Sequence, residues 1–263
     1  MESALEEIEF LALSSNRVEV LRLLAAEPHS RGDLATETGA SQATLGRIIA
    51  DFEERSWIRR TDGEYVATAT GRIVADGFTD LLDSLETERK LRDIVEYLPT
   101  DAMEFDLRHL ADATITVPSQ TRPNAPVQRL LDLLRDAEVV RTFSHAFNDQ
   151  TIRVVQERVS AGDQQFSGVF SPGAIDALAA DDRLRTQLES LLAEPAASVR
   201  VRSDGVPLAV MIADDVVHLL LRDDSGVLQA SLDTTAPAVR EWAIERFDTY
   251  WESADPLSTE RLL

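Results

Sequence analysis

Residues 38–50 contain no acidic side chain, although this 263-residue chain has 47 Asp and Glu residues. The stretch holds an amide and a guanidinium, Gln42 and Arg47. In the major groove of DNA, glutamine reads adenine, and arginine reads guanine or holds a phosphate. The small residues Ala43 and Gly46 would let a helix lie deep in that groove. The pattern favours DNA binding. The alternative is an ordinary surface arginine on a solvated helix.

Two further arginines precede the dipeptide Asp62-Gly63, which is typical of a tight hairpin turn. A hairpin would bring these arginines to the phosphates of the DNA backbone. The candidate DNA contacts are Ser41, Gln42, Ala43, Thr44, Gly46, Arg47, Arg59 and Arg60.

A second group of polar residues lies in the C-terminal half, where strands and helices alternate. Ser144-His145 and Ser171 each follow a predicted strand, and small molecules bind at the carboxyl ends of strands in α/β sheets. Arginines, including Arg200, could neutralise an anionic ligand. The candidate ligand-binding residues are Ser144, His145, Ser171, Arg202, His218 and Arg222. Alternatively, these are solvated or helix-capping residues.

Several kinds of catalytic and metal site are excluded. The chain has no cysteine, and its four histidines never occur in a short metal-ligand spacing. It also lacks the G-x-S-x-G, P-loop and G-x-G-x-x-G motifs. Asp214-Asp215 and Asp223-Asp224 could bind a cation, but turn residues on an acidic surface explain them better. We expect no enzyme, no metal and no cofactor.

The elements that would position the DNA contacts are predicted by apolar periodicity and capping residues. Helices are expected at 4–13, 17–26 and 31–38, the last capped by Ser30 and ended by Gly39. Ser41 caps a further helix, and residues 41–54 would be the recognition helix. Its DNA-contacting face would lie opposite the apolar positions 45, 48, 49 and 52. A hairpin follows over 57–67. This order is that of a winged helix-turn-helix.

Residues 34–47, LATETGASQATLGR, resemble the L-A-x-x-x-G-x-S-x-x-T-V-x-R run of prokaryotic winged-helix transcription regulators. FEERSWI at 52–58 is similar to the run that leads into their wing, with Ser56 in place of the usual glycine. Tyr65, Thr68 and Gly71 resemble the Y-x-L-T-x-x-G pattern that closes the wing in archaeal members. The resemblance implies a DNA-binding domain over residues 1–72.

The segment from 72 to 98 lacks proline and predicts one long helix that Pro99 ends. Its apolar positions at 78, 81, 82 and 85 follow a heptad-like pattern. We interpret residues 73–100 as a connecting helix that pairs with its copy in a homodimer. The alternative is that it packs on its own chain.

Residues 101–263 are predicted to form an α/β domain with a mixed sheet. Strands are expected at 114–117, 139–143, 165–170, 199–202, 206–213, 216–222 and 227–232, and helices at 127–135, 149–161, 175–193 and 237–251. The runs PLAVMIAD at 207–214 and DDSG at 223–226, with Trp242, Phe247 and Tyr250, resemble the effector domain of methanogenesis-regulator-type transcription factors. The resemblance implies a degenerate phospholipase D-like fold. The H-x-K signature of that fold is missing, because Lys90 is the only lysine.

The charge composition suggests a host. The formal net charge is −21, and 25 of the 26 basic residues are arginine. This resembles haloarchaeal proteins, although an acidic mesophilic protein from a GC-rich genome is the alternative. At about 1 M salt the Debye length shrinks to roughly 3 Å, so the global charge argues little against DNA binding.

Together these features predict an α+β, multidomain, sequence-specific transcription regulator. The expected partners are double-stranded promoter DNA, a second copy of the chain and a small-molecule effector. No apolar run reaches 18 residues, and the N-terminus is acidic, so we expect a soluble cytoplasmic protein without a membrane segment. The alternative function is a winged-helix protein-interaction or scaffold module without specific DNA binding.

Overall fold

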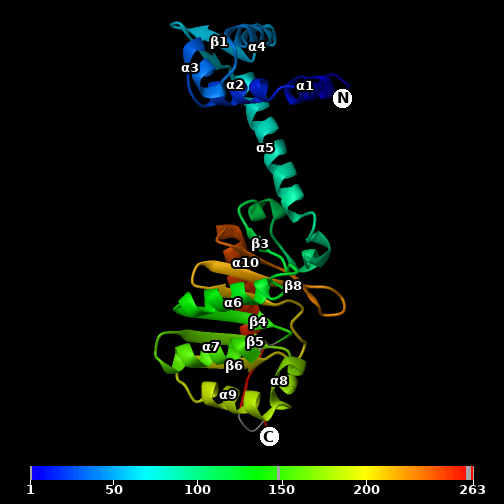
Figure 1. Ribbon diagram of the computed structural model, residues 1–263, viewed down its shortest axis with the longest axis vertical. Helices are drawn as coiled ribbons and strands as arrows, with labels where there is room; N and C mark the ends of the chain where they lie inside the picture. Colours follow the sequence, from blue (N-terminus) through cyan, green and yellow to red (C-terminus); the bar gives the residue numbers. More distant parts are fainter. Residues whose placement is uncertain (1, 147–148, 259–261, 263) are drawn as a thin grey trace. The chain divides into compact units, whose positions relative to one another are not determined.

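The computed structural model describes residues 2–146, 149–258 and 262. It divides into two compact units, Met1–Glu88 and Arg89–Leu263 (Figure 1). The described elements of unit 1 are α1 (Glu2–Ala12), α2 (Ser15–Ala26), α3 (Arg31–Thr38), α4 (Gln42–Glu54), β1 (Ile58–Thr61), β2 (Glu64–Ala67) and most of α5 (Ala69–Leu91).

Local capping residues fix the ends of α3 and the start of α4, as the sequence predicted. Ser30 and Asp33 form a capping box, in which each side chain accepts from the backbone N–H of the other residue. Gly39 adopts the left-handed conformation, with φ of 66°, after α3. The side chain of Ser41 accepts from the N–H of Thr44 and so caps α4.

The core of unit 1 forms where α4 packs against the other helices and the hairpin. The predicted apolar positions of α4 are all buried: Leu45, Ile48, Ile49 and Phe52. The rings of Phe10 and Trp57 lie within about 6 Å of the Phe52 ring, centroid to centroid. Burial of this face leaves the opposite face of α4 to solvent.

The β1–β2 hairpin leads tightly into α5. Asp62 and Gly63 have φ of 53° and 93°, as expected for the predicted Asp-Gly turn. The hydroxyl of Thr68 accepts from the N–H of Gly71 and donates to the carbonyls of Ser56 and Trp57. A Cβ on Gly71 would lie 1.9 Å from the Trp57 carbonyl oxygen, so no larger residue fits there. Ser56 has φ of 56°, a conformation that favours glycine.

α5 ends at Leu91 and does not run on to residue 98, so the predicted length was wrong. The chain then tightens into short 3-10 turns, beginning with η1 (Val95–Tyr97). Pro99 disfavours helical backbone at the residue before it. Leu91, Ile94 and Leu98 are buried in the core of unit 2.

Unit 2 is built on a mixed sheet, in which the described residues form eight strands in the order β10-β6-β5-β4-β7-β8-β9-β3. β4, β5 and β6 are parallel, and the other neighbours are antiparallel. The strands are β3 (Thr114–Thr116), β4 (Val139–Ser144), β5 (Gln165–Phe170), β6 (Ala197–Val201), β7 (Val210–Ala213), β8 (Val216–Arg222), β9 (Leu228–Thr234) and β10 (Asp255–Pro256).

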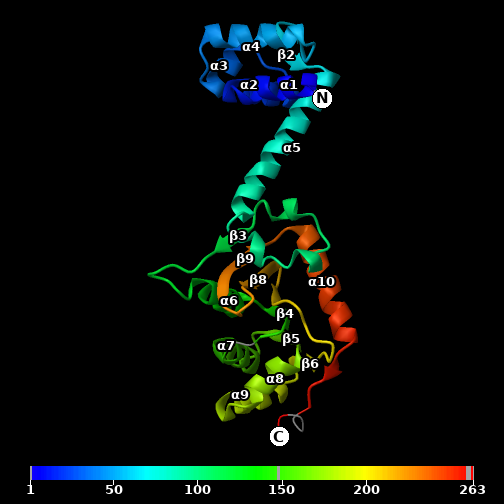
Figure 2. The same ribbon diagram turned by 90° about the vertical axis from the view of Figure 1, so that its right-hand side faces the viewer.

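Helices cover both faces of this sheet (Figure 2). α10 (Pro237–Glu252) lies on one face, over a core that includes Phe143 and Leu219. The opposite face carries α6 (Ala125–Asp136), α7 (Asp149–Ser160), α8 (Pro172–Ala179) and α9 (Asp182–Leu192). The mixed α/β sandwich predicted for this half is confirmed.

Two local predictions in unit 2 were wrong, and one strand was missed. The helix expected at 175–193 is two helices, because Asp181 adopts an extended conformation and caps α9. The strand expected over 206–213 begins only at Val210, where pairing with β4 and β8 starts. The edge strand β10 had no sequence signal, since Asp-Pro at 255–256 is an unfavourable strand sequence.

Candidate nucleic-acid interface and internal pocket

The first turn of α4 and its exposed face carry most of the predicted DNA contacts. Ser41, Gln42, Ala43 and Arg47 are exposed, whereas Thr44 and Gly46 are half-buried. The hydroxyls of Ser41 and Thr44 lie 2.9 Å apart, and both belong to the helix cap.

Arg31, which sequence reasoning missed, lies across this face. Its guanidinium donates to the carbonyl of Gln42, and Nη2 lies 2.7 Å from where a Cβ on Gly46 would be. Gly46 therefore makes room for Arg31. No spacing in the sequence indicated this contact, because the loop between α3 and α4 decides which residues meet.

The arginines of unit 1 fall into two groups. Some are paired with carboxylates: Arg17 with Asp51, Arg22 with Glu19 and Arg55 with Glu7. Within the described part of the chain, five others form no ion pair. Arg72 donates to the Ala67 carbonyl, and the other four are Arg31, Arg47, Arg59 and Arg60. These four come from α3, α4 and β1, and all four are exposed. Consecutive strand residues project to opposite faces, so the hairpin presents a guanidinium on each side.

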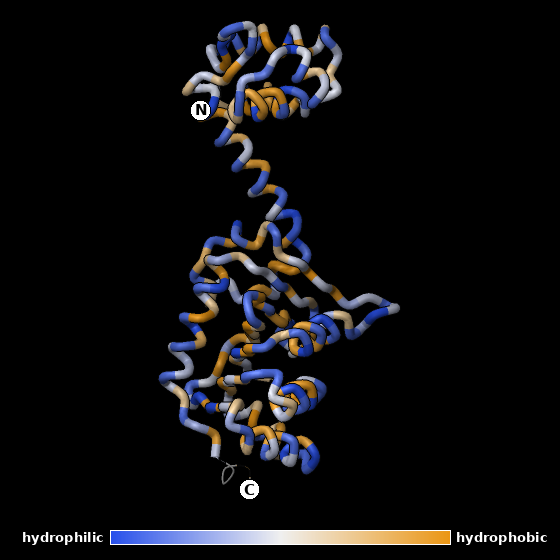
Figure 3. Tube along the Cα trace, turned by 90° about the vertical axis from the view of Figure 1, so that its left-hand side faces the viewer, coloured by the Kyte–Doolittle hydropathy of each residue, from blue (hydrophilic) through white to orange (hydrophobic). Residues whose placement is uncertain are grey.

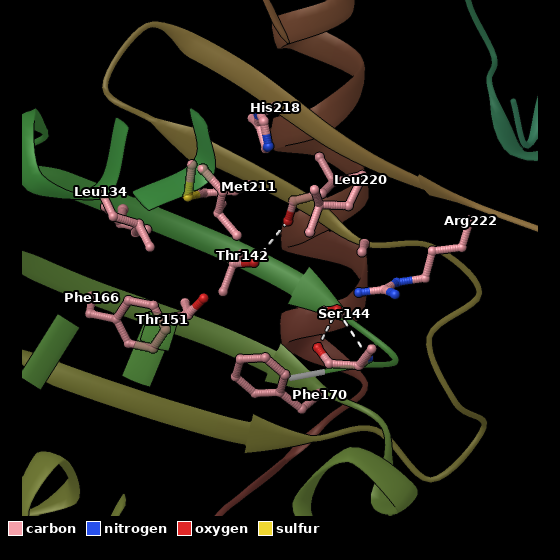
Figure 4. Close-up of a pocket in the computed structure, with 15 residues that line it drawn as sticks. Leu134, Thr142, Ser144, Thr151, Phe166, Phe170, Met211, His218, Leu220 and Arg222 are labelled. Atoms are coloured by element: carbon pink, nitrogen blue, oxygen red, sulfur yellow. Dashed lines mark hydrogen bonds between the residues drawn. The ribbon is translucent and has the colours of Figure 1, made fainter. Parts of the chain in front are cut away.

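Unit 2 contains a pocket between α6 and the sheet, with a volume of about 60 Å³ (Figure 4). Most of its wall is apolar: Leu130, Leu134, Val140, Phe166, Phe170, Met211 and Leu220. A Cβ on Gly168 would meet the rings of Phe166 and Phe170, so glycine lets both rings converge there. Polar lining residues are Thr142, Ser144, Thr151, His218 and Arg222.

His218 is buried beside the ion pair that Asp233 forms with Arg129. Its Nδ1 lies 3.3 Å from Oδ1 of Asp233, the neighbouring residue on β9. Nε and Nη2 of Arg129 donate to Oδ2 of the same carboxylate, at 2.9 and 2.7 Å. Burial raises the pKa of Asp233, but the hydrogen bonds from His218 and Arg129 outweigh it and hold the pKa below its usual value.

Burial lowers the pKa of His218 by more than the Asp233 carboxylate raises it. The physical reason is that Arg129 already balances the charge of Asp233, so a protonated ring would leave an uncompensated buried cation. His218 is therefore neutral, with its proton on Nδ1 toward Asp233 and a lone pair on Nε2.

Three buried polar atoms of the pocket residues find no hydrogen-bond partner among the residues described. They are Nε2 of His218, Oγ1 of Thr151 and Nε of Arg222. More than nine-tenths of buried polar groups in proteins are paired, so three in one pocket are unusual. Neither Thr151 on α7 nor the Arg129–Asp233 pair, which joins α6 to β9, was a sequence candidate, because only the fold brings these elements together.

The other ligand candidates have different surroundings. The Ser144 hydroxyl donates to the Ala146 carbonyl at the rim of the pocket. His145 lines an adjoining cleft, where partial burial and the charge of Arg222 lower its pKa. Ser171 caps α8, and Arg202 donates to the Gly205 carbonyl beside the Tyr250 ring. Ser171 and Arg202 do not line the pocket.

The acidic pairs lie in turns. The Asp214 carboxylate accepts from the backbone N–H groups of Glu138 and Val139. Asp223 accepts from Ser225 and Val227 and so closes its own turn. Across residues 2–146, 149–258 and 262, no three acidic or histidine side chains gather as a metal site. No helix in that part of the chain is long and apolar enough to cross a membrane.

Two family models match this chain. Residues 5–90 match the model described as HVO_A0261 N-terminal domain. Residues 123–253 match the model described as methanogenesis regulatory protein FilR1, middle domain. No curated protein matches the chain.

Solved structures with similar chains include TrmBL2, an archaeal chromatin protein, at 14% identity, with 95% of this chain and 98% of that chain covered and a TM-score of 0.45. NUC from Salmonella typhimurium, a phospholipase D family member, is 14% identical, with 55% and 98% covered and a TM-score of 0.42. NucT from Helicobacter pylori is 15% identical, with 55% and 98% covered and a TM-score of 0.43.

Proposed function

Because the family-model matches point to an archaeal regulator family, we propose that the chain is a sequence-specific DNA-binding transcription regulator. In this proposal residues 1–72 form a winged helix-turn-helix, with α4 as its recognition helix and the β1–β2 hairpin as its wing. Residues 73–100 connect this domain to residues 101–263, which sense a ligand or mediate dimerisation. The proposed DNA-binding role requires no catalytic group. The sequence has a single lysine, Lys90, whose ammonium group donates a hydrogen bond to the Ala111 carbonyl.

The observation that carries the proposal is the set of unpaired arginines around α4. Residues 1–72 hold 13 acidic residues and eight arginines, so carboxylates are abundant. Even so, Arg31, Arg47, Arg59 and Arg60 form no ion pair in the described part of the chain. DNA phosphates would supply the missing anions, and Gln42 and Arg47 on the exposed face of α4 would reach base edges.

The acidity of the whole chain is compatible with this role if the host has a salt-rich cytoplasm, which we also propose. The net charge of −21 would repel DNA in dilute buffer. At about 1 M salt the screening length is roughly 3 Å, so only charged groups in direct contact interact strongly.

We further propose that the protein is a homodimer that binds two half-sites. Leu81, Leu82 and Leu85 on α5 are exposed, at 40%, 37% and 53% of their surface. Hydrophobic residues recur along this helix (Figure 3). Pairing of α5 with its copy would cover them and present two α4 helices to a pseudo-palindromic site.

The test begins with chromatin immunoprecipitation of the tagged protein in its host, followed by affinity measurements on the motif that emerges. Arg47→Ala should weaken binding of that motif by about 5- to 150-fold, the usual effect of losing one base-reading arginine. Arg22→Ala is the matched control, because Arg22 is exposed on α2 and paired with Glu19.

Sharp promoter peaks with a shared motif, together with this difference between the variants, would support the proposal. A flat profile from an expressed protein, or equal affinities of the two variants, would contradict it. A flat profile would favour the protein-interaction alternative.

A further inference from the structure

The pocket between α6 and the sheet has an acceptor at one end. Nδ1–H of His218 donates to Asp233, which Arg129 holds ionised, so the lone pair of Nε2 faces away from this pair. Nε2 is buried without a partner among the described residues, and His218 lines the pocket. A ligand group that meets Nε2 must therefore be a donor, such as a hydroxyl.

The other end of the pocket has a cation. His218, Leu220 and Arg222 alternate along β8, so all three project from the same face of the sheet. Figure 4 shows the guanidinium of Arg222 turned toward Ser144 at the end of β4. One of its nitrogens donates to the Gly226 carbonyl, whereas Nε is buried without a partner among the described residues. Arg222 forms no ion pair with any of those residues, so a carboxylate would satisfy both its charge and its free N–H.

The space between the two ends limits the size of the ligand. Four strand residues of about 3.3 Å separate the Cα atoms of His218 and Arg222 by roughly 13 Å, and both side chains reach inward from these ends. The volume of about 60 Å³ holds roughly four to six water-sized groups. The wall in between is mostly apolar, with Thr142 and Thr151 among its polar residues. A ligand can extend past Arg222 into the adjoining cleft, which shares Leu220 and Arg222 with the pocket.

We propose that this pocket binds a short-chain carboxylate with a hydroxyl group at its far end. The carboxylate pairs with Arg222, the hydroxyl donates to Nε2 of His218, and the carbon chain lies against Leu134, Met211 and Leu220. The free hydroxyl of Thr151 supplies one more hydrogen bond along the chain. This inference rests on the proposed ligand-sensing role of residues 101–263 and does not depend on DNA binding.

The experiment is calorimetric titration of the full chain with 4-hydroxybutanoate, compared with butanoate and butan-1-ol, which each lack one polar end. Loss of one buried hydrogen bond or charge contact should weaken binding at least about 10-fold in each case. The chain has four histidines, so the ring ¹⁵N spectrum is simple. The Nε2 resonance of His218 should move with 4-hydroxybutanoate and stay in place with butanoate.

Variants locate the site. Arg222→Gln should weaken binding of 4-hydroxybutanoate at least about 10-fold, and Thr151→Val, which keeps the side-chain shape, should weaken it by a smaller factor. Arg246→Gln is the matched control, because Arg246 pairs with Glu104 and lies on α10, across the sheet.

Failure of all terminal hydroxy carboxylates of three to six carbons to bind would overturn the inference, as would equal affinities for butanoate and 4-hydroxybutanoate. Either result would leave the comparison of Arg47→Ala with Arg22→Ala on DNA unaffected. The two proposals therefore fail separately.

Discussion

Replacement of His218 by glutamine tests the charge state on which the pocket chemistry depends. Glutamine keeps a donor for Asp233 but does not titrate. In the folded protein, burial holds the pKa of His218 below its ordinary value of 6.5. At pH values just below 6.5 the unfolded chain therefore binds a proton that the folded chain does not.

The sign and size of the effect follow from proton linkage. The stability that neutral His218 contributes is complete above about pH 6.5 and is lost as the pH falls. If the folded ring stays neutral, the loss between about pH 7.5 and pH 5.5 is about 1.4 kcal/mol. His218→Gln should lack this loss. Asp233 adds nothing in this window, because its folded pKa is below 3.8.

The assay is guanidinium unfolding at the two pH values, followed by tryptophan fluorescence in a Trp57→Phe background. The remaining tryptophans, Trp242 and Trp251, both lie on α10 and report on unit 2 alone. His145, whose pKa is also lowered, is present in both the parent and the His218→Gln variant, so its contribution to the pH dependence cancels in the comparison.

Equal losses of unfolding free energy in the parent and in His218→Gln would refute the reasoning. That result would mean that His218 takes up its proton as easily in the folded chain as in the unfolded one. Nε2 would then be a donor at mildly acid pH, and the hydroxyl group assigned to the ligand would be wrong.

Three further predictions concern unit 1. Gly71→Ala should destabilise it by about 3 kcal/mol or more, because the new Cβ would lie 1.9 Å from the Trp57 carbonyl oxygen. Guanidinium unfolding would measure this loss. Gly77→Ala on the same helix has open space around it and should stabilise by about 0.5–1 kcal/mol, so similar effects of the two variants would contradict this packing. Ser56→Gly should raise the unfolding free energy by up to about 1 kcal/mol, because it relieves a left-handed conformation, and an unchanged denaturation midpoint would argue against that strain. Leu85→Glu should convert the proposed dimer to a monomer in light scattering, and a monomeric parent would remove the basis for this prediction.

Structure that depends on near neighbours was predictable from the sequence. Ser30, Gly39 and Ser41 set the ends of α3 and α4 through hydrogen bonds within four residues. Asp62-Gly63 set the hairpin turn through its own backbone preference. The periodicity of α4 identified its buried face, and with it the exposed Gln42 and Arg47. The break between α8 and α9 and the end of α5 were missed, because packing and single capping residues decide them.

The amino-acid sequence by itself determined the order of the elements, the buried face of α4 and the arginine-rich, lysine-poor charge of the chain, since composition, periodicity and capping act along the backbone. Only the tertiary structure decided which side chains meet. The Arg129–Asp233 pair spans 104 residues, and it exists because α6 crosses the sheet beside β9. The same crossing buries His218 and leaves Nε2 facing a pocket. Sheet order and helix placement follow from the packing of many apolar side chains at once, which no local pattern records.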